Sequence, residues 1–243
     1  MRDSDSEFDV AVIVTGEPIA AARDRVGGFT ELIARGAAGS RARFVAFDAR
    51  LELPSARDFS AALVTGSAAS VTERAPWMLA TEGWLARAVE DAFPVFGICF
   101  GHQLLGQALG GRVERNPNGR EIGTVALEPL TDDPLLALGN RELRVNMTHV
   151  DSIVALPPGV TVVARTALDP YAAVRFGKCC WGVQFHPEID REVMADYVEG
   201  RREAIASEGL DLGRIRAELG EGAAGREVLR RFLDGVAGGG FER

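Results

Sequence analysis

Short apolar runs recur along the first part of the chain, separated by polar and glycine-containing segments. They are Phe8 to Val14, Arg43 to Phe47, Ala61 to Val64 and Pro94 to Ile98. Short runs rich in valine, isoleucine and phenylalanine are typical of strands buried on both faces, as in a parallel sheet covered by helices. We therefore expect each run to be a buried strand.

Helix-like segments lie between these runs. Residues Phe29 to Arg35 and Trp77 to Asp91 have helical character, and Pro76 stands at a suitable first position of the second helix. Strands that alternate with helices are joined by right-handed crossovers in a doubly wound sheet. The first part of the chain therefore predicts an α/β fold.

The pattern changes after Gly111 to short extended pieces separated by turns, and it becomes helical again from Asp190. We expect several of these pieces to be antiparallel neighbours. Two segments have the composition of turns, Asn116 to Gly119 and Leu156 to Gly159. Near the end of the chain, residues 225–239 predict an amphipathic helix that ends at glycines. The expected strands are Glu121 to Glu128, Leu143 to Thr148, Val160 to Thr166, Tyr171 to Phe176 and Cys180 to Phe185.

Composition is that of an ordinary globular protein, and 243 residues, 47% of them hydrophobic, suit one domain over residues 1–243. The net charge of −8, without a clustered basic stripe, argues against nucleic-acid binding. An acidic and polar start followed by a short apolar run predicts neither a secretory leader nor a membrane span. Three cysteines, Cys99, Cys179 and Cys180, form no disulfide framework, so we expect a cytoplasmic protein.

The segment Gly97-Ile98-Cys99-Phe100-Gly101 has the form glycine, any residue, nucleophile, any residue, glycine. It follows a predicted strand and precedes a helical run, which is the context of a nucleophile elbow. A helix N-terminus lowers the pKa of a thiol placed there. Cys99 is equally compatible with a small buried apolar residue, so a partner base is needed to decide.

His186 is the strongest candidate for that base. It lies in the segment Gln184-Phe185-His186-Pro187-Glu188, and a residue before proline favours extended geometry. Side chains two apart on an extended segment point to the same side. We expect Glu188 to orient the imidazole of His186, which takes the proton of Cys99.

The chain has two other histidines, His102 and His149. Cys99 and His102 would make half of a metal site, but no second Cys/His pair has a matching spacing, so we expect His102 to cap or pack around the elbow. His149 is either a surface loop residue or a wall of the substrate pocket, and we favour the pocket.

Acyl transfer also needs donors for the developing oxyanion. The amide of Phe100 is one candidate by elbow geometry. The other is Gly66 in the segment Leu63 to Ser67, for which an ordinary turn glycine is an equally good interpretation.

The motifs GICFGHQ and GVQFHPE together resemble those of the class I glutamine amidotransferases, the triad type. Within that family the chain is similar to the amidotransferase domain of GMP synthase, over a stretch from about Phe8 to Glu188. The resemblance implies a flavodoxin-like fold: a central, mostly parallel sheet flanked by helices, with a smaller antiparallel β element. It also implies a catalytic core over about residues 8–190 and a C-terminal helical extension over about residues 191–243.

The resemblance further implies hydrolysis of a glutamine γ-carboxamide through a γ-glutamyl thioester, without a metal or organic cofactor. The implied roles are nucleophile for Cys99, general base and then acid for His186, orienting carboxylate for Glu188, oxyanion-hole amides for Gly66 and Phe100, and contacts to the α-amino and α-carboxylate groups for Gln103, Thr148 and His149.

Two positions depart from the family pattern. Family members often have Gly-Gly-Pro where this chain has Thr65-Gly66-Ser67. Arg120 stands where similar sequences often have an aromatic residue, so the sequence leaves its contacts open.

The chain shows no glycine-rich phosphate loop, and the residues after Glu188 are too few for a second catalytic domain. Three functions remain: a glutaminase subunit that releases ammonia to a partner synthase, a stand-alone hydrolase of γ-glutamyl peptides or amides, or a non-catalytic regulatory or binding module. Each enzymatic function takes glutamine or another γ-glutamyl small molecule. The sequence leaves the oligomeric state open.

Overall fold

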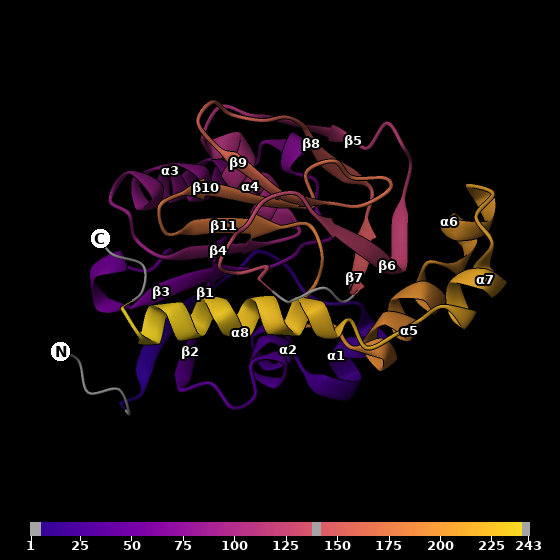
Figure 1. Cartoon of the computed structure of the whole chain (residues 1–243), viewed down its shortest axis with the longest axis horizontal. Helices are drawn as coiled ribbons and strands as arrows, with labels where there is room; N and C mark the ends of the chain where they lie inside the picture. The colour runs from indigo at the N-terminus through magenta and orange to yellow at the C-terminus, as the bar shows by residue number, and fades with distance from the viewer. Residues whose placement is uncertain (1–5, 138–141, 240–243) are drawn as a thin grey trace.

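The computed structural model describes residues 6–137 and 142–239. Within them, nine strands form one sheet, which runs through the middle of the molecule (Figure 1). In spatial order the strands are β2 (Ala42–Asp48), β1 (Phe8–Val14), β3 (Ala61–Val64), β4 (Val95–Ile98), β11 (Cys180–Val183), β10 (Ala173–Gly177), β9 (Thr161–Arg165), β6 (Glu121–Pro129) and β7 (Leu143–His149).

The sheet has a parallel half and an antiparallel half. Strands β2, β1, β3, β4 and β11 pair in parallel, in the order typical of flavodoxin-like folds. Strands β10, β9, β6 and β7 continue the sheet with antiparallel pairing. A separate antiparallel pair joins β5 (Arg112–Arg115) to β8 (Asp151–Ala155). The expected α/β class and antiparallel neighbours are therefore confirmed.

Helices cover both faces of the parallel half. On one face, α2 (Phe29–Gly36) and α8 (Ala223–Ala237) share a buried cluster with Leu63 and Phe96. On the other, α3 (Pro76–Glu90) and α4 (Phe100–Ala108) share a cluster with Val64 and Val95. Adjacent residues of one strand thus point to opposite faces, as a sheet covered on both sides requires.

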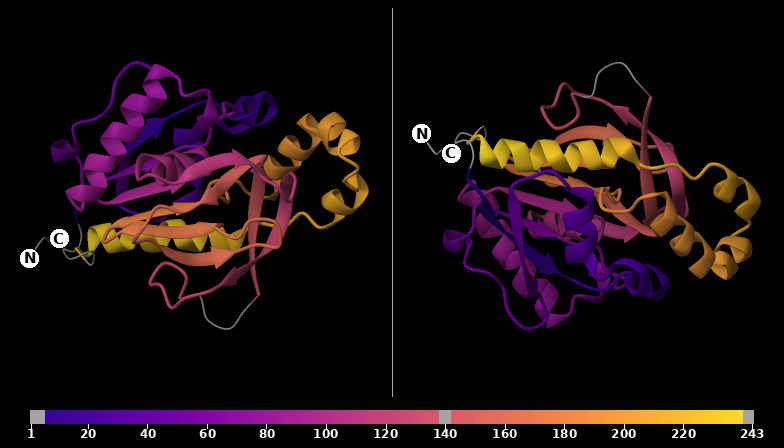
Figure 2. Two further views of the ribbon diagram at one scale, coloured as in Figure 1. Left: turned by 90° about the horizontal axis from the view of Figure 1, so that it is seen from above. Right: turned by 90° about the horizontal axis from the view of Figure 1, so that it is seen from below.

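A group of short helices lies at the end of the sheet formed by β6 and β7 (Figure 2). It comprises α5 (Arg191–Gly200), α6 (Arg202–Ser207) and α7 (Leu212–Ala217), and α5 also packs against α1 (Ala20–Val26). From there the chain returns along the sheet as α8 (Figure 1). None of the helices in the described ranges has the length and apolar character needed to cross a membrane.

Most predicted elements are present with ends shifted by one or two residues, and Pro76 is the first residue of α3. The expectation that Arg43 to Phe47 is buried on both faces is wrong. This segment belongs to β2, which pairs with β1 at the sheet edge, and Val45 is 40% exposed. The sequence analysis also missed α1, β5 and β8.

Candidate active site

Cys99 lies in a tight turn between β4 and α4, with φ of 50° and ψ of −100°. This left-handed backbone costs an L-residue about 1–3 kcal/mol, and such strain concentrates at functional sites. A Cβ atom at Gly97 would lie 2.6 Å from the Gly101 carbonyl oxygen, and one at Gly101 would lie 2.4 Å from the Val64 carbonyl oxygen. The turn therefore has the elbow geometry that the sequence predicts, and it requires both glycines.

Two contacts connect Cys99 to the segment that follows β11. The Cys99 amide donates to the Val183 carbonyl oxygen at 2.8 Å. The Nε2 of Gln184 donates to the Cys99 sulfur at 3.4 Å, and Gln184 is fully buried. Because an amide donor stabilises a thiolate more than a thiol, Gln184 favours the ionised form of Cys99.

His186 and Glu188 form a hydrogen-bonded pair beside this turn. The His186 Nδ1 lies 2.7 Å from the Glu188 Oε1, and both side chains are almost fully buried. The His186 amide donates to the Asn146 carbonyl oxygen on β7, which anchors the segment. The His186 Nε2 has no hydrogen-bond partner in the part of the chain that the structure describes. The expected contact between the two side chains is present, and the second ring nitrogen is free to exchange a proton.

Cys99 and His186 shift the pKa of one another. Burial opposes ionisation of the Cys99 thiol, but the positive charges of His186 and His149 outweigh it and lower the thiol pKa. Burial also opposes protonation of His186, while the negative charges of Glu188 and the Cys99 thiolate raise its pKa to about 10. The geometry therefore shifts this pair toward a thiolate and an imidazolium.

Gly66 lies two residues after the end of β3 and faces the same site. A Cβ atom there would lie 2.9 Å from the His186 Cε1 and 3.8 Å from the Cys99 Cβ. The hydroxyl of Thr15 donates to the Gly66 carbonyl oxygen, and the Thr65 hydroxyl accepts from the Thr15 amide, both at 3.0 Å. These buried hydroxyls hold the loop at the position where family members often have Gly-Gly-Pro. Phe100, the other predicted oxyanion residue, begins α4, where helix amides lack intrahelical acceptors.

A cavity of about 220 Å³ opens at Cys99. The three residues predicted to contact the substrate, Gln103, Thr148 and His149, line it. The Nε2 of Gln103 donates to the Asp151 carbonyl oxygen at 2.8 Å and to the Gln184 Oε1 at 3.1 Å. Gln103 therefore connects the cavity wall to the residue that donates to Cys99.

His149 belongs to a buried polar network rather than to a surface loop. Its Nε2 lies 3.1 Å from the Glu121 Oε2, and that oxygen also accepts from the Thr166 hydroxyl at 2.9 Å. Burial opposes protonation of His149, but the hydrogen bond with Glu121 and the charge of Asp169 raise its pKa. The expectation that His149 walls the pocket thus agrees with its position.

His102 points away from Cys99, into the core. Its ring packs 5.6 Å from the ring of Phe176, and a Cβ atom at Gly182 would meet its Nδ1 at 2.5 Å. Burial lowers the His102 pKa to about 3, so the ring is neutral. It packs beneath the elbow without capping α4, and the described ranges hold no group of three or more side chains suited to a metal ion.

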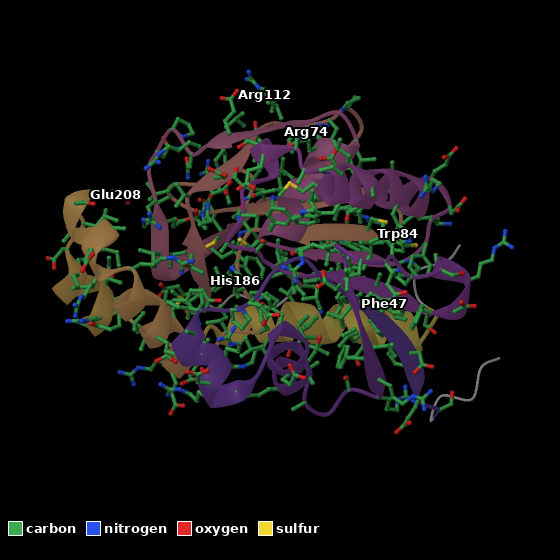
Figure 3. All side chains as sticks on the ribbon, turned by 180° about the vertical axis from the view of Figure 1, so that it is seen from behind. Phe47, Arg74, Trp84, Arg112, His186 and Glu208 are labelled. Carbon is green, nitrogen blue, oxygen red and sulfur yellow. The ribbon has the colours of Figure 1, made fainter. Side chains whose placement is uncertain are left out.

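Arg120 and Arg201 also line the cavity at Cys99. The Arg120 guanidinium makes two bonds to Glu208, its Nε at 2.8 Å and its Nη2 at 3.1 Å. This pair connects β6's start to the end of α6, and Figure 3 shows Glu208 on the helices at the end of the molecule and His186 in its interior. In this chain the position where similar sequences often have an aromatic residue thus carries an arginine that pairs with Glu208.

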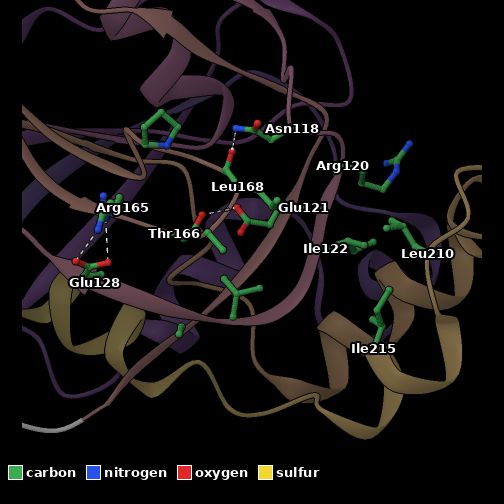
Figure 4. Close-up of a pocket in the computed structure, with 14 residues that line it drawn as sticks. Asn118, Arg120, Glu121, Ile122, Glu128, Arg165, Thr166, Leu168, Leu210 and Ile215 are labelled. Carbon is green, nitrogen blue, oxygen red and sulfur yellow. Dashed lines mark hydrogen bonds and ion pairs between the residues drawn. The ribbon is translucent and has the colours of Figure 1, made fainter.

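A second, larger cavity of about 680 Å³ shares Arg120 with the first. It lies between β6 and the helices that follow α5, with Ile122, Leu210 and Ile215 on one side (Figure 4). The ion pair between Arg165 and Glu128 lies at its opposite side (Figure 4). Its walls are mostly apolar, so it suits a larger apolar group than the first cavity does.

Sequence reasoning missed Gln184, Arg201 and the cavity role of Arg120. Gln184 lies in the bend that follows β11, where alternation along a strand does not predict the side to which a residue points. Arg201 lies beyond the recognised motif at the end of α5, and no local pattern places a helix end beside Cys99.

Comparisons with known proteins agree on one family. The family model described as glutamine amidotransferase class-I matches residues 22–199. A GMP synthase [glutamine-hydrolyzing] of Thermomicrobium roseum is 42% identical over 127 residues, which are 52% of this chain and 23% of that protein. The one of Thermosipho africanus is 34% identical over 174 residues, 70% of this chain and 32% of that protein. This chain thus spans about a quarter to a third of the length of these curated relatives.

Solved structures share the fold over nearly the whole chain. A glutamine amidotransferase from Thermotoga maritima has a TM-score of 0.70 at 22% identity, covering 98% of this chain and 99% of its own. A glutamine amidotransferase from Methylobacillus flagellatus has a TM-score of 0.72 at 22% identity, covering 98% and 97%. At this identity the likeness concerns the fold alone.

Proposed function

Since this chain belongs to the class I glutamine amidotransferase family, we propose that it hydrolyses the γ-carboxamide of glutamine through a γ-glutamyl thioester on Cys99. The observation that carries the proposal is the contact of 2.7 Å between the His186 Nδ1 and the Glu188 Oε1, beside a cysteine on a strained turn. This arrangement matches the requirement of a nucleophile for a base that is itself oriented by a third group.

The reaction follows from these positions. The Cys99 thiolate attacks the γ-carbonyl carbon, and the amides of Gly66 and Phe100 stabilise the oxyanion that forms. The imidazolium of His186 donates its proton to the departing nitrogen, which leaves as ammonia. Neutral His186 then accepts a proton from water, and the resulting hydroxide attacks the thioester to release glutamate and regenerate Cys99. Glu188 stabilises the imidazolium each time it forms.

Substrate recognition in this proposal falls to Gln103, Thr148 and His149, which hold the α-amino and α-carboxylate groups. All three line the cavity at Cys99. The ammonia goes to a partner synthase, a role supported by the names of the relatives, since both GMP synthases match this chain over a minor part of their own length.

A second candidate function is stand-alone hydrolysis of a γ-glutamyl amide or peptide. The observation that favours it is the mostly apolar cavity of about 680 Å³, which shares Arg120 with the cavity at Cys99. Such a volume offers room for an amine much larger than ammonia. The two enzymatic functions use the same chemistry and differ in the leaving amine.

The test is release of glutamate and ammonia by the purified chain. We expect Cys99→Ala to reduce the rate by at least about 10³-fold, and mass spectrometry of the rapidly quenched parent protein to detect a γ-glutamyl adduct on Cys99. Cys179→Ala is the matched control, because Cys179 is buried away from the cavity. A folded Cys99→Ala protein with parental activity would refute the mechanism.

A substrate panel separates the candidate functions. A partnered subunit turns over glutamine slowly alone and faster with its synthase, whereas a stand-alone hydrolase is fully active alone on some γ-glutamyl peptide or amide. A properly folded parent protein that hydrolyses none of these compounds, and whose Cys99 resists a glutamine-like electrophile, would instead indicate a non-catalytic binding module.

A further inference from the structure

Arg201 presents a guanidinium to the cavity at Cys99 from the C-terminal end of α5. Its Nη1 donates to the Thr148 hydroxyl at 2.8 Å. Its guanidinium carbon lies 4.8 Å from the centre of the Tyr197 ring, a cation–π contact. These two contacts hold the group in one orientation, which reduces the entropy that it loses when a ligand binds.

Arg201 differs from the neighbouring arginines in its charge balance. Arg120 pairs with Glu208, and Arg202 pairs with Glu199. Within residues 6–137 and 142–239, by contrast, no carboxylate lies within ion-pair distance of Arg201. A guanidinium has five N–H donors, and Thr148 accepts from one of them. The group therefore retains both its charge and most of its hydrogen-bonding capacity.

The surroundings of Arg201 make that free charge costly. The side chain is partly buried, and Arg120, a second guanidinium, lies on the wall of the same cavity. Burial of an unpaired charge is unfavourable, and so is the approach of two like charges. A ligand carboxylate in the cavity would offset both costs and can accept two parallel N–H bonds from one guanidinium.

We propose that Arg201 contributes an ion pair to carboxylate binding in the cavity at Cys99, in addition to the contacts of Gln103, Thr148 and His149, and thereby selects γ-glutamyl substrates. That these substrates are γ-glutamyl compounds rests on the proposed function, whereas anion binding by Arg201 does not. Two substrate carboxylates have the required chemistry: the α-carboxylate of the glutamyl group, which glutamine also carries, and the terminal carboxylate of an amino-acid leaving group in a γ-glutamyl peptide.

The test measures binding in a protein that cannot turn over its ligand. In the Cys99→Ala background, calorimetry compares Arg201→Gln, Arg201→Lys and Arg202→Gln with the parent for glutamine, γ-glutamylglycine and the C-terminal amide of γ-glutamylglycine. We expect Arg201→Gln to weaken binding of a carboxylate-bearing ligand by about 10- to 100-fold, and Arg201→Lys to recover part of it. The control Arg202→Gln should stay within about twofold.

The three ligands identify which carboxylate is bound. If Arg201 binds the α-carboxylate, Arg201→Gln weakens all three ligands equally. If it binds the leaving-group carboxylate, Arg201→Gln weakens γ-glutamylglycine alone, and the C-terminal amide binds the parent about as weakly as γ-glutamylglycine binds the variant. In the catalytic protein the same loss should raise KM more than it lowers kcat.

The inference would be overturned if Arg201→Gln and its parent bound all three ligands with equal affinity, or if none of the proteins bound any of them. It would also be overturned if Arg202→Gln lost as much affinity as Arg201→Gln, or if Arg201→Lys bound no more tightly than Arg201→Gln. Because Cys99 is absent from the binding protein, these outcomes are separate from failure of the hydrolysis mechanism. A protein that binds through Arg201 but releases no glutamate would keep the inference and refute the proposed function.

Discussion

The chemical state of Cys99 depends on three side chains from the segment after β11. Gln184 donates to the sulfur, His186 lowers the thiol pKa by its charge, and Glu188 stabilises that charge from the far side of the ring. Removal of the Glu188 carboxylate lowers the His186 pKa, so that less of the ring is protonated. With less positive charge beside it, the Cys99 thiolate is stabilised less.

This chain of effects predicts the behaviour of Glu188→Gln. The Cys99 pKa lies below its ordinary value, so the parent thiol should react with iodoacetamide at lower pH than a free thiol. In the variant the His186 pKa falls and imidazolium is lost. This loss outweighs removal of the Glu188 charge, which by itself raises the Cys99 pKa less than His186 lowers it, so the Cys99 pKa rises toward its ordinary value. We expect the midpoint of the pH–alkylation curve to move to higher pH.

The control for this measurement is Glu192→Gln, since Glu192 is a mostly exposed carboxylate that pairs with Arg25. It should leave the midpoint unchanged. A midpoint that stays in place or moves down in Glu188→Gln would contradict the role assigned to Glu188. Counting only alkylation at Cys99, by peptide mapping, keeps Cys179 and Cys180 out of the result.

Gly66 permits a second prediction for a single residue. The added Cβ of Gly66→Ala would lie 2.9 Å from the buried His186 ring and must displace it. We expect kcat/KM for glutamine to fall by about 10²-fold or more, since small displacements of catalytic groups are costly. The matched control is Gly83→Ala in α3, where the nearest atom is 3.8 Å away and stability should rise by about 1 kcal/mol. Near-parental activity of Gly66→Ala would contradict the close approach of Gly66 to the His186 ring.

Among the elements, the strand–turn–helix at Cys99 was the most predictable from sequence. Its glycines, its apolar strand and its helix are consecutive, so the sequence carries all the information that the turn needs. The expected pairing of His186 with Glu188 is present, but the extended geometry expected for it is wrong. Residues 187 and 188 form a turn, in which the Ile189 amide donates to the His186 carbonyl oxygen at 3.4 Å. The contact of that segment with Cys99 was inferred from the chemistry of the motifs rather than from any local pattern.

Elements whose structure depends on neighbours distant in the sequence were harder to predict from the sequence. β2 was expected to be buried, but its exposure follows from its place at the sheet edge, which an apolar run does not encode. The short strands β5 and β8 acquire their structure by pairing with one another across many intervening residues. Arg120 and Arg201 reach the cavity through the placement of β6 and α5, which only the tertiary fold determines.

The pair of Arg120 with Glu208 leads to a prediction about α6. Glu208 follows α6 and forms ion pairs with Arg115 and Arg120, which lie outside the helices. Glu208→Gln removes the negative charge from both ion pairs. We expect faster amide hydrogen exchange in α6 and a loss of less than about 1 kcal/mol in the free energy of unfolding, because the pair is partly exposed. Glu218→Gln, which breaks an exposed pair within the α7 region, should leave exchange in α6 unchanged. Unaltered exchange in Glu208→Gln would show that the pair does not hold this helix.

At the scale of the whole molecule, the C-terminal helix completes the core. Phe232 of α8 is fully buried, and its ring lies 5.2 Å from that of Phe96 on β4 and 6.3 Å from that of Trp181 on β11. Val228 and Leu229 are buried in the same cluster. We therefore propose that the part of the chain that the structure describes unfolds as one cooperative unit, in which the helices after residue 190 return to cover the sheet that carries Cys99.

This proposal predicts a large effect of Phe232→Ala far from the cavity. Removal of a buried aromatic ring should reduce the free energy of unfolding by about 3–5 kcal/mol. Urea denaturation measures this loss, and the dependence of the free energy on urea concentration should stay the same. Because Cys180 is fully buried on β11, the strand that leads to His186, fluorescence of the core and protection of Cys180 from alkylation should be lost at the same urea concentration. If α8 were a separate appendage, Phe232→Ala would leave the midpoint of Cys180 exposure unchanged, and the two probes would report different transitions.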